Sequence, residues 1–82
     1  MKIALIGAGV QGQVLCAMFV ANPDIEEVRV ADKRLDVAER LASYLKSDKV
    51  SVHKVDASDV EDLLKVTKGV DVVVNAALPW LN

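Results

Sequence analysis

The sequence predicts an α/β fold, in which helices alternate with the strands of a parallel sheet. An apolar run at residues 3–6 leads directly into a glycine-rich turn at residues 7–12, and a long helical pattern follows the turn. Further valine-rich runs then alternate with amphipathic segments as far as residue 75. This order predicts βαβαβαβ connectivity, and right-handed crossovers place the strands in the sheet order 3-2-1-4. The arrangement is the first part of a doubly wound, or Rossmann, fold.

The first strand is expected at residues 2–7, which are apolar on both faces, as in the interior of a parallel sheet. The first helix is expected at residues 11–21, before the stop at Asn22-Pro23-Asp24. Its buried stripe is expected at helical spacing, on Val14, Ala17, Met18 and Ala21. Because Leu15, Phe19 and Val20 make the helix apolar almost all round, burial on more than one side is also expected.

The second strand and helix are expected at residues 27–31 and 36–46. The strand ends at Asp32, and the helix has an apolar stripe on Ala38, Leu41, Ala42 and Leu45. Asp36 and Glu39 have the spacing of a capping box, which favours a helix start at this point.

The third strand is expected at residues 50–55, where polar side chains among valines indicate an outer, partly wet strand. The third helix is expected to begin at the capping-box sequence Ser58-Asp59-Val60-Glu61 and to end at Gly69. The fourth strand is expected at residues 70–75, and its central valines are typical of an interior strand.

The turn after the first strand reads Gly7-Ala8-Gly9-Val10-Gln11-Gly12, the G-x-G-x-x-G spacing of a dinucleotide-binding fingerprint. Gly7 allows the tight turn, Gly9 allows a pyrophosphate to approach the backbone, and Gly12 allows the helix to pack closely on the strand. The N–H groups of Val10 and Gln11, around the expected start of the helix, then point at the phosphates. The alternative is a strand-to-helix turn that holds no ligand.

Asp32 lies 20 residues past Gly12, where a carboxylate that binds the adenosine ribose is expected. Its alternative role is a cap for the second helix. A carboxylate here repels a 2′-phosphate and favours NAD, whereas Arg34, next to Lys33, could clamp that phosphate and favour NADP. We predict NAD as the cofactor, with NADP as the alternative, because charged residues that open a helix are more often only solvated.

Two further groups of residues follow strand ends and are candidates for the cofactor site. Asp56, at the end of the third strand, is placed to accept a hydrogen bond from the adenine amino group, or else to cap the third helix together with Ser58. Ala76 and Ala77 follow the fourth strand and are small enough for close passage of the ribose–nicotinamide link. The alternative for these two alanines is a plain loop.

Composition excludes several other classes of function. The chain has 82 residues, is 52% apolar and has a formal net charge of -2, with no basic stripe for nucleic acid. The single cysteine, Cys16, rules out an internal disulfide and a multi-cysteine metal site, and the single histidine, His53, cannot build a metal centre without distant ligands. Glycines interrupt the apolar N-terminus, so neither a signal peptide nor a membrane span of about 20 apolar residues is expected. We expect a cytoplasmic protein, with Cys16 as a buried, inert thiol and His53 at the surface.

The chain holds only part of a complete dinucleotide-binding domain, which has six strands in two halves. We therefore expect residues 1–82 to be the N-terminal part of a longer enzyme whose substrate domain is absent here. The fourth strand would then have a bare apolar edge, and such edges pair with other chains. The expected assembly is a homodimer in which two copies of this strand pair across a twofold axis.

The chain resembles the N-terminal nucleotide-binding domain of the saccharopine dehydrogenase family. The likeness covers essentially the whole chain, and its matching segments are residues 1–12, 30–34, 55–59 and 69–79. The last segment, with Asn75-Ala76-Ala77-Leu78-Pro79 after the fourth strand, is the most specific part. The resemblance implies an NAD(P)-linked oxidoreductase that acts on a carbon–nitrogen bond of an amino acid, a diamine, or a secondary amine joining two amino-acid skeletons.

The resemblance also implies that substrate binding and dimerisation reside in a later domain, so no catalytic residue is assigned within these 82 residues. The alternative function is a non-catalytic domain that senses a nucleotide and regulates a transport system. Such domains share the glycine block and the acid after the second strand, but they generally lack a loop like that at residues 75–79.

Overall fold

The structure is a computed structural model that describes residues 1–76. It contains four parallel strands in the order β3-β2-β1-β4, as predicted. The elements are β1 (Lys2–Ile6), α1 (Val10–Ala21), β2 (Glu27–Asp32), α2 (Leu35–Leu45), β3 (Val50–Lys54), α3 (Val60–Thr67) and β4 (Val72–Asn75). Each element forms where the sequence predicted it, and the ends move by a residue or two.

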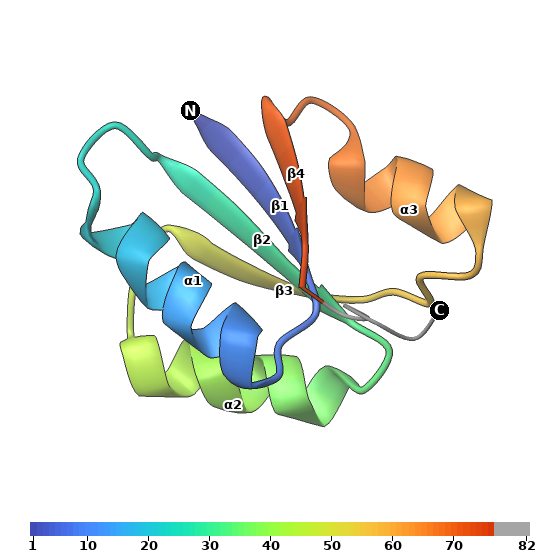
Figure 1. The fold of residues 1–82 in the computed structure, drawn as a ribbon, viewed down its shortest axis with the longest axis horizontal. Helices are drawn as coiled ribbons and strands as arrows, with labels where there is room; N and C mark the ends of the chain where they lie inside the picture. The colour runs from blue at the N-terminus through green and yellow to red at the C-terminus, as the bar shows by residue number, and fades with distance from the viewer. Residues whose placement is uncertain (77–82) are drawn as a thin grey trace.

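The helices cover the two faces of the sheet unequally. Helices α1 and α2 lie on one face and α3 lies on the other (Figure 1). The larger core forms under α1 and α2, where Leu5 of β1 stands in register with Val30 of β2 and Val74 of β4. A smaller cluster of Ile6, Ala31, Val55 and Val66 forms under α3. The carboxyl ends of all four strands therefore meet at one edge between these layers.

The buried face of α1 differs from the prediction. The residues that face the sheet are Gly12, Leu15, Cys16, Phe19 and Val20, whereas Val14, Ala17, Met18 and Ala21 are exposed. Because the helix is apolar on every side, periodicity could not choose between the two stripes. The choice is made by the close packing of α1 on the turn before it, which rotates the smallest residue of the helix toward the sheet.

Both predicted capping boxes are wrong. Helix α2 has Arg34 as its N-cap and receives no side-chain cap bond, so Asp36 and Glu39 do not form a box. Helix α3 is capped by Asp59, whose carboxylate accepts hydrogen bonds from the N–H groups of Glu61 and Asp62. Ser58 takes no part in this cap, because its hydroxyl donates to another side chain.

Within the described residues, the sheet has an open edge at β4. Val72 and Val73 of β4 remain 39% and 51% exposed, because β4 pairs with β1 on one side only within residues 1–76. Among these residues, no helix has the length and apolar character needed to cross a bilayer.

Candidate dinucleotide-binding site

The turn between β1 and α1 requires glycine at two positions. Gly7 has a φ of 107°, in the region that side chains disfavour, and its N–H donates to the carbonyl oxygen of Ala31 at 2.7 Å. A Cβ on Gly12 would collide with the carbonyl oxygen of Gly7 and lie 3.0 Å from its carbonyl carbon. The two glycines therefore let α1 start directly against the end of β1, as predicted.

Gly9 is different, because protein atoms do not require it to be glycine. It is the N-cap of α1, with a φ of -74°, and a Cβ built on it would meet nothing within 4 Å. Within the described residues, the N–H groups of residues 9–12 have no hydrogen-bond partner, and Val10 and Gln11 are exposed. An open N-terminus with free amides and a positive dipole end fits a pyrophosphate group.

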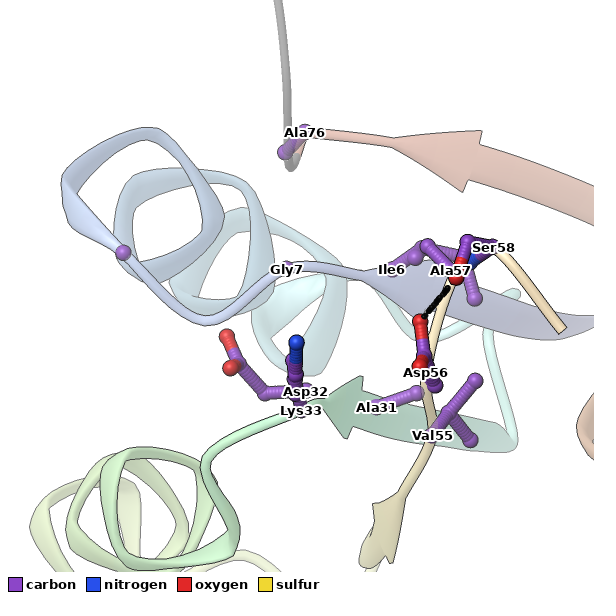
Figure 2. Close-up of a pocket in the computed structure, with 11 residues that line it drawn as sticks. Ile6, Gly7, Ala31, Asp32, Lys33, Val55, Asp56, Ala57, Ser58 and Ala76 are labelled. Atoms are coloured by element: carbon purple, nitrogen blue, oxygen red, sulfur yellow. Dashed lines mark hydrogen bonds between the residues drawn. The ribbon is translucent and has the colours of Figure 1, made fainter. Parts of the chain in front are cut away.

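A cavity of about 450 Å³ lies beside this turn, at the carboxyl ends of the strands. Figure 2 shows its lining side chains, which come from the ends of all four strands and the loops after them. The lining residues are Ile6, Gly7, Gly9, Ala31, Asp32, Lys33, Val55, Asp56, Ala57, Ser58 and Ala76. Ligands of open α/β sheets bind outside the carboxyl ends of the strands, at the point where the strand order reverses. In the order β3-β2-β1-β4 this point lies beside β1.

The Asp32 carboxylate stands between the glycine turn and the start of α2. Its Oδ2 accepts from the N–H of Ala8 and its Oδ1 accepts from the N–H of Arg34, both at 2.8 Å. Neither donor belongs to α2, which begins at Leu35, so the alternative role of Asp32 as a cap for this helix is wrong. Each oxygen retains acceptor capacity, because an ionised carboxylate has about four lone-pair sites.

The Asp56 side chain is held by Ser58. Its Oδ1 accepts from the Ser58 hydroxyl at 2.6 Å and from the Ser58 N–H at 2.9 Å. These two bonds, with the nearby charge of Lys33, hold the pKa of the Asp56 carboxyl below its ordinary value. Because Asp59 caps α3, the alternative role of Asp56 as a helix cap is wrong. Its Oδ2 has no partner within residues 1–76 and remains available to a ligand.

The remaining predicted site residues divide between the cavity and its surroundings. Lys33 and Ala76 line the cavity, and the N–H of Ala76 donates to the carbonyl oxygen of Ile6 at 2.8 Å. Arg34 lies outside the lining, where its guanidinium is 3.4 Å from the Asp36 carboxylate in an exposed pair. Ala77 lies outside the described residues.

Five lining residues were not predicted from the sequence as site residues: Ile6, Ala31, Val55, Ala57 and Ser58. Each adjoins a predicted site residue at a strand end or follows Asp56 in the loop, so position alone could have suggested them. Ile6, Ala31 and Val55 are buried and form the floor of the cavity, and Ser58 holds the Asp56 carboxylate in place. The site thus offers amide donors for phosphate and two anchored carboxylates for hydroxyl or amino groups.

The described residues do not support a metal site or a reactive cysteine or histidine. No group of three or more histidine, cysteine or acidic side chains within residues 1–76 is placed to hold a metal ion. Burial raises the pKa of the Cys16 thiol to about 11, so the thiol stays protonated, as expected for an inert residue. His53 is half-buried on β3, and its Nε2 lies 2.9 Å from the hydroxyl of Ser51, away from the cavity.

Comparisons with known proteins agree with this geometry. The family model described as "Saccharopine dehydrogenase NADP binding domain" matches residues 3–82. The chain is 30% identical over 81 residues to carboxyaminopropylagmatine dehydrogenase from Synechocystis sp., covering 96% of this chain and 20% of that protein.

Two solved structures share the fold. Quinate dehydrogenase from Corynebacterium glutamicum in complex with NAD has a TM-score of 0.72 and 28% identity over 93% of this chain and 26% of its own. Apo saccharopine dehydrogenase (L-Glu forming) from Saccharomyces cerevisiae has a TM-score of 0.74 and 33% identity over 92% of this chain and 16% of its own. The chain thus spans about a fifth of the curated relative, and none of these proteins favours the regulatory alternative. Together with the glycine turn and the cavity, they show that the chain belongs to the saccharopine dehydrogenase NADP-binding domain family and is an NAD(P)-binding domain.

Proposed function

We propose that this domain serves an oxidoreductase that acts on a carbon–nitrogen bond of an amino acid or of a secondary amine derived from amino acids. The observation that carries its dinucleotide-binding part is the cavity at the strand ends, where free amide donors lie beside two carboxylates. The family match supports a dehydrogenase, and the names of two relatives, one for saccharopine and one for carboxyaminopropylagmatine, support an amine substrate. Quinate dehydrogenase shares the fold and, by its name, acts on quinate.

Each predicted contact has a physical basis in the site. The N–H groups at Gly9, Val10 and Gln11 bind the pyrophosphate, and Gly12 keeps α1 close enough to present them. Asp32 accepts from the ribose hydroxyls, and the free oxygen of Asp56 accepts from the adenine amino group. Ala76 lines the cavity and borders the path of the nicotinamide end, and the same role stays a sequence-based prediction for Ala77.

The charge around Asp32 favours NAD over NADP. A 2′-phosphate would lie against a carboxylate that two backbone bonds hold in place, and this repulsion is not relieved by movement of the side chain. Lys33 lines the same cavity and offsets part of the repulsion, whereas Arg34 is turned toward Asp36. That exposed ion pair is worth about 0–1 kcal/mol, so Arg34 is the residue through which NADP could still bind.

The chemistry of the whole protein requires more than this domain. Bound NAD(P) supplies hydride transfer at its nicotinamide ring. The residues described here bind and orient the dinucleotide, and none of them is proposed as catalytic. We propose that a separate substrate domain of a cytoplasmic, full-length enzyme supplies the amine site.

Titration of NADH and NADPH by calorimetry tests the proposal. The unmodified chain should bind NADH more tightly than NADPH. Asp32→Asn removes the repulsive charge and one ribose acceptor, so the NADPH-to-NADH ratio of dissociation constants should fall about tenfold, which corresponds to about 1.4 kcal/mol. Arg34→Ala is the matched variant and should weaken NADPH alone. Absence of heat with either dinucleotide would contradict the proposed function.

A further inference from the structure

The carboxylate of Asp32 makes contacts that have nothing to do with a ribose. Its Oδ2 accepts from the N–H of Ala8, in the glycine turn, while its Oδ1 accepts from the N–H of Arg34. Ala8 has no exposed surface and packs in the core under α1. Water therefore has little access to this amide, and without Asp32 the N–H would lose its acceptor.

The bond lies where the backbone ladder between β1 and β2 stops. The last backbone bond of this ladder runs from the Gly7 N–H to the Ala31 carbonyl oxygen at 2.7 Å. The left-handed conformation of Gly7 then turns the chain away from the sheet. The next amide, that of Ala8, is bonded by the side chain of the next residue of β2, so Asp32 extends the ladder by one rung into the turn.

We infer that Asp32 is a positioning residue for the phosphate site: its carboxylate holds the glycine turn in the shape that presents the amides of residues 9–12, before any ligand binds. The inference rests on the proposed function, because it concerns the same site. A protein whose competent conformation is only partly populated binds its ligand more weakly in the same proportion. Release of the turn therefore weakens binding of the phosphate group itself, in addition to any loss of ribose contacts.

This role and a simple charge effect predict opposite results for an anion that has no ribose. If Asp32 acted only through its charge, its removal would reduce repulsion and tighten the binding of inorganic pyrophosphate. If Asp32 positions the turn, its removal weakens the same binding. Inorganic pyrophosphate is therefore the probe that separates the two.

The experiment is an NMR titration of the 82-residue chain with inorganic pyrophosphate, which follows the amide signals of residues 9–12. Asp32→Ala should raise the dissociation constant about fivefold or more, as for a turn that is competent for about a fifth of the time. Asp32→Asn keeps one acceptor oxygen for the two N–H donors, so its dissociation constant should lie between those of the unmodified chain and of Asp32→Ala. Asp48→Ala, which removes the same charge in the exposed turn between α2 and β3, should match the unmodified chain.

Amide hydrogen exchange without ligand gives a second readout. The Ala8 amide should exchange slowly in the unmodified chain and in Asp48→Ala, and faster in Asp32→Ala. Equal or tighter pyrophosphate binding by Asp32→Ala, or an Ala8 amide that stays protected in it, would overturn the inference. If circular dichroism shows that Asp32→Ala is unfolded, Asp32→Asn decides by the same two measurements. If the unmodified chain binds neither pyrophosphate nor NADH, the proposed function fails, while Ala8 exchange still tests the hold on the turn.

Discussion

Two glycines of the turn have different roles: Gly12 is needed for the fold, and Gly9 leaves space for the ligand. Gly12 faces the carbonyl of Gly7, with no space for a Cβ, whereas the corresponding direction at Gly9 is open. The backbone of Gly9 is in a region that any residue adopts. A side chain at Gly12 therefore disturbs the packing of α1 on β1, and a side chain at Gly9 occupies space that a phosphate needs.

We predict that Gly12→Ala lowers the free energy of unfolding by about 1–3 kcal/mol, the usual cost of overpacking. Gly9→Ala should leave stability nearly unchanged and weaken NADH binding. Urea denaturation and NADH titration of both variants measure the two effects, and each variant is the control for the other. A Gly12→Ala chain as stable as the unmodified one would show that α1 can shift away from the turn without cost.

At the scale of elements, α3 depends on one side chain from the strand beneath it. Helix α3 has eight residues and is too short to be stable alone. Arg29 of β2 donates from Nη1 to the carbonyl oxygens of Val66 and Lys68, at 3.1 and 2.6 Å, and its Nε pairs with Glu27 at 2.8 Å. Arg29 thus supplies donors to two carbonyl oxygens at the carboxyl end of α3, where the helix itself leaves carbonyl groups without partners.

Arg29→Met should therefore loosen α3 while keeping most of the apolar part of the side chain. Hydrogen bonds from a charged donor contribute about 1.5–3 kcal/mol, and the loss should appear in urea denaturation and in faster amide exchange along α3. Arg40→Met, on the exposed side of α2, is the control and should have little effect. Unchanged exchange in α3 of Arg29→Met would mean that the contacts of Leu63 and Val66 suffice to hold the helix.

The same face of the sheet makes stability depend on pH through His53 of β3. Burial, and then the charge of Arg29, lower the pKa of His53, while Glu27 acts in the opposite direction. The unfolded chain, with an ordinary pKa of about 6.5, then binds more protons than the folded chain as the pH falls. Stability is present above this value and is lost as the pH falls from about 6.5 toward the lower pKa of the folded state.

The urea midpoint of the unmodified chain should therefore fall between about pH 7.5 and about pH 5.5, because this range spans the ordinary histidine pKa. His53→Gln keeps a polar partner for Ser51 and should show a smaller fall. Glu27 and Asp56, whose pKa values lie below their ordinary ones, lose their contributions only at lower pH. An equal fall in the variant would assign the pH dependence to other groups.

The elements also show which parts of the structure could be predicted from local sequence patterns. The strand, glycine turn and helix start were predictable, because each requires particular residues at fixed spacing, as at Gly7 and Gly12. The buried stripe of α1 was not, because Val14 and Leu15 are equally apolar and only the packing against the turn chooses between them. The Asp32 bond to the glycine turn joins residues 24 apart in the chain, so no local pattern reveals it.

At the scale of the whole molecule, the exposed large apolar side chains of residues 1–76 lie on β4, on all three helices and at Met1. Those on the helices are Val10, Val14 and Met18 of α1, Tyr44 of α2, and Val60 and Leu64 of α3, and each is more than half exposed. These side chains lie on helices, where most backbone groups beyond the first turn bond within the helix. Strand β4 pairs on one side only within residues 1–76 and exposes Val72 and Val73, so its edge is the surface best suited to pair with another chain.

The predicted homodimer through β4 can therefore be tested by one substitution and a matched control. Light scattering after size exclusion at low micromolar concentration should give twice the monomer mass for the unmodified chain. Val73→Lys places a charge on the edge, where a twofold axis would bring it near its copy, and should shift the chain toward monomer. Val60→Lys makes the same change on a valine of α3 that is still more exposed, at 68% against 51% for Val73, and should leave the dimer intact. A clean monomer for the unmodified chain would rule the dimer out, and a dimer that survives Val73→Lys but not Val60→Lys would move the interface to α3.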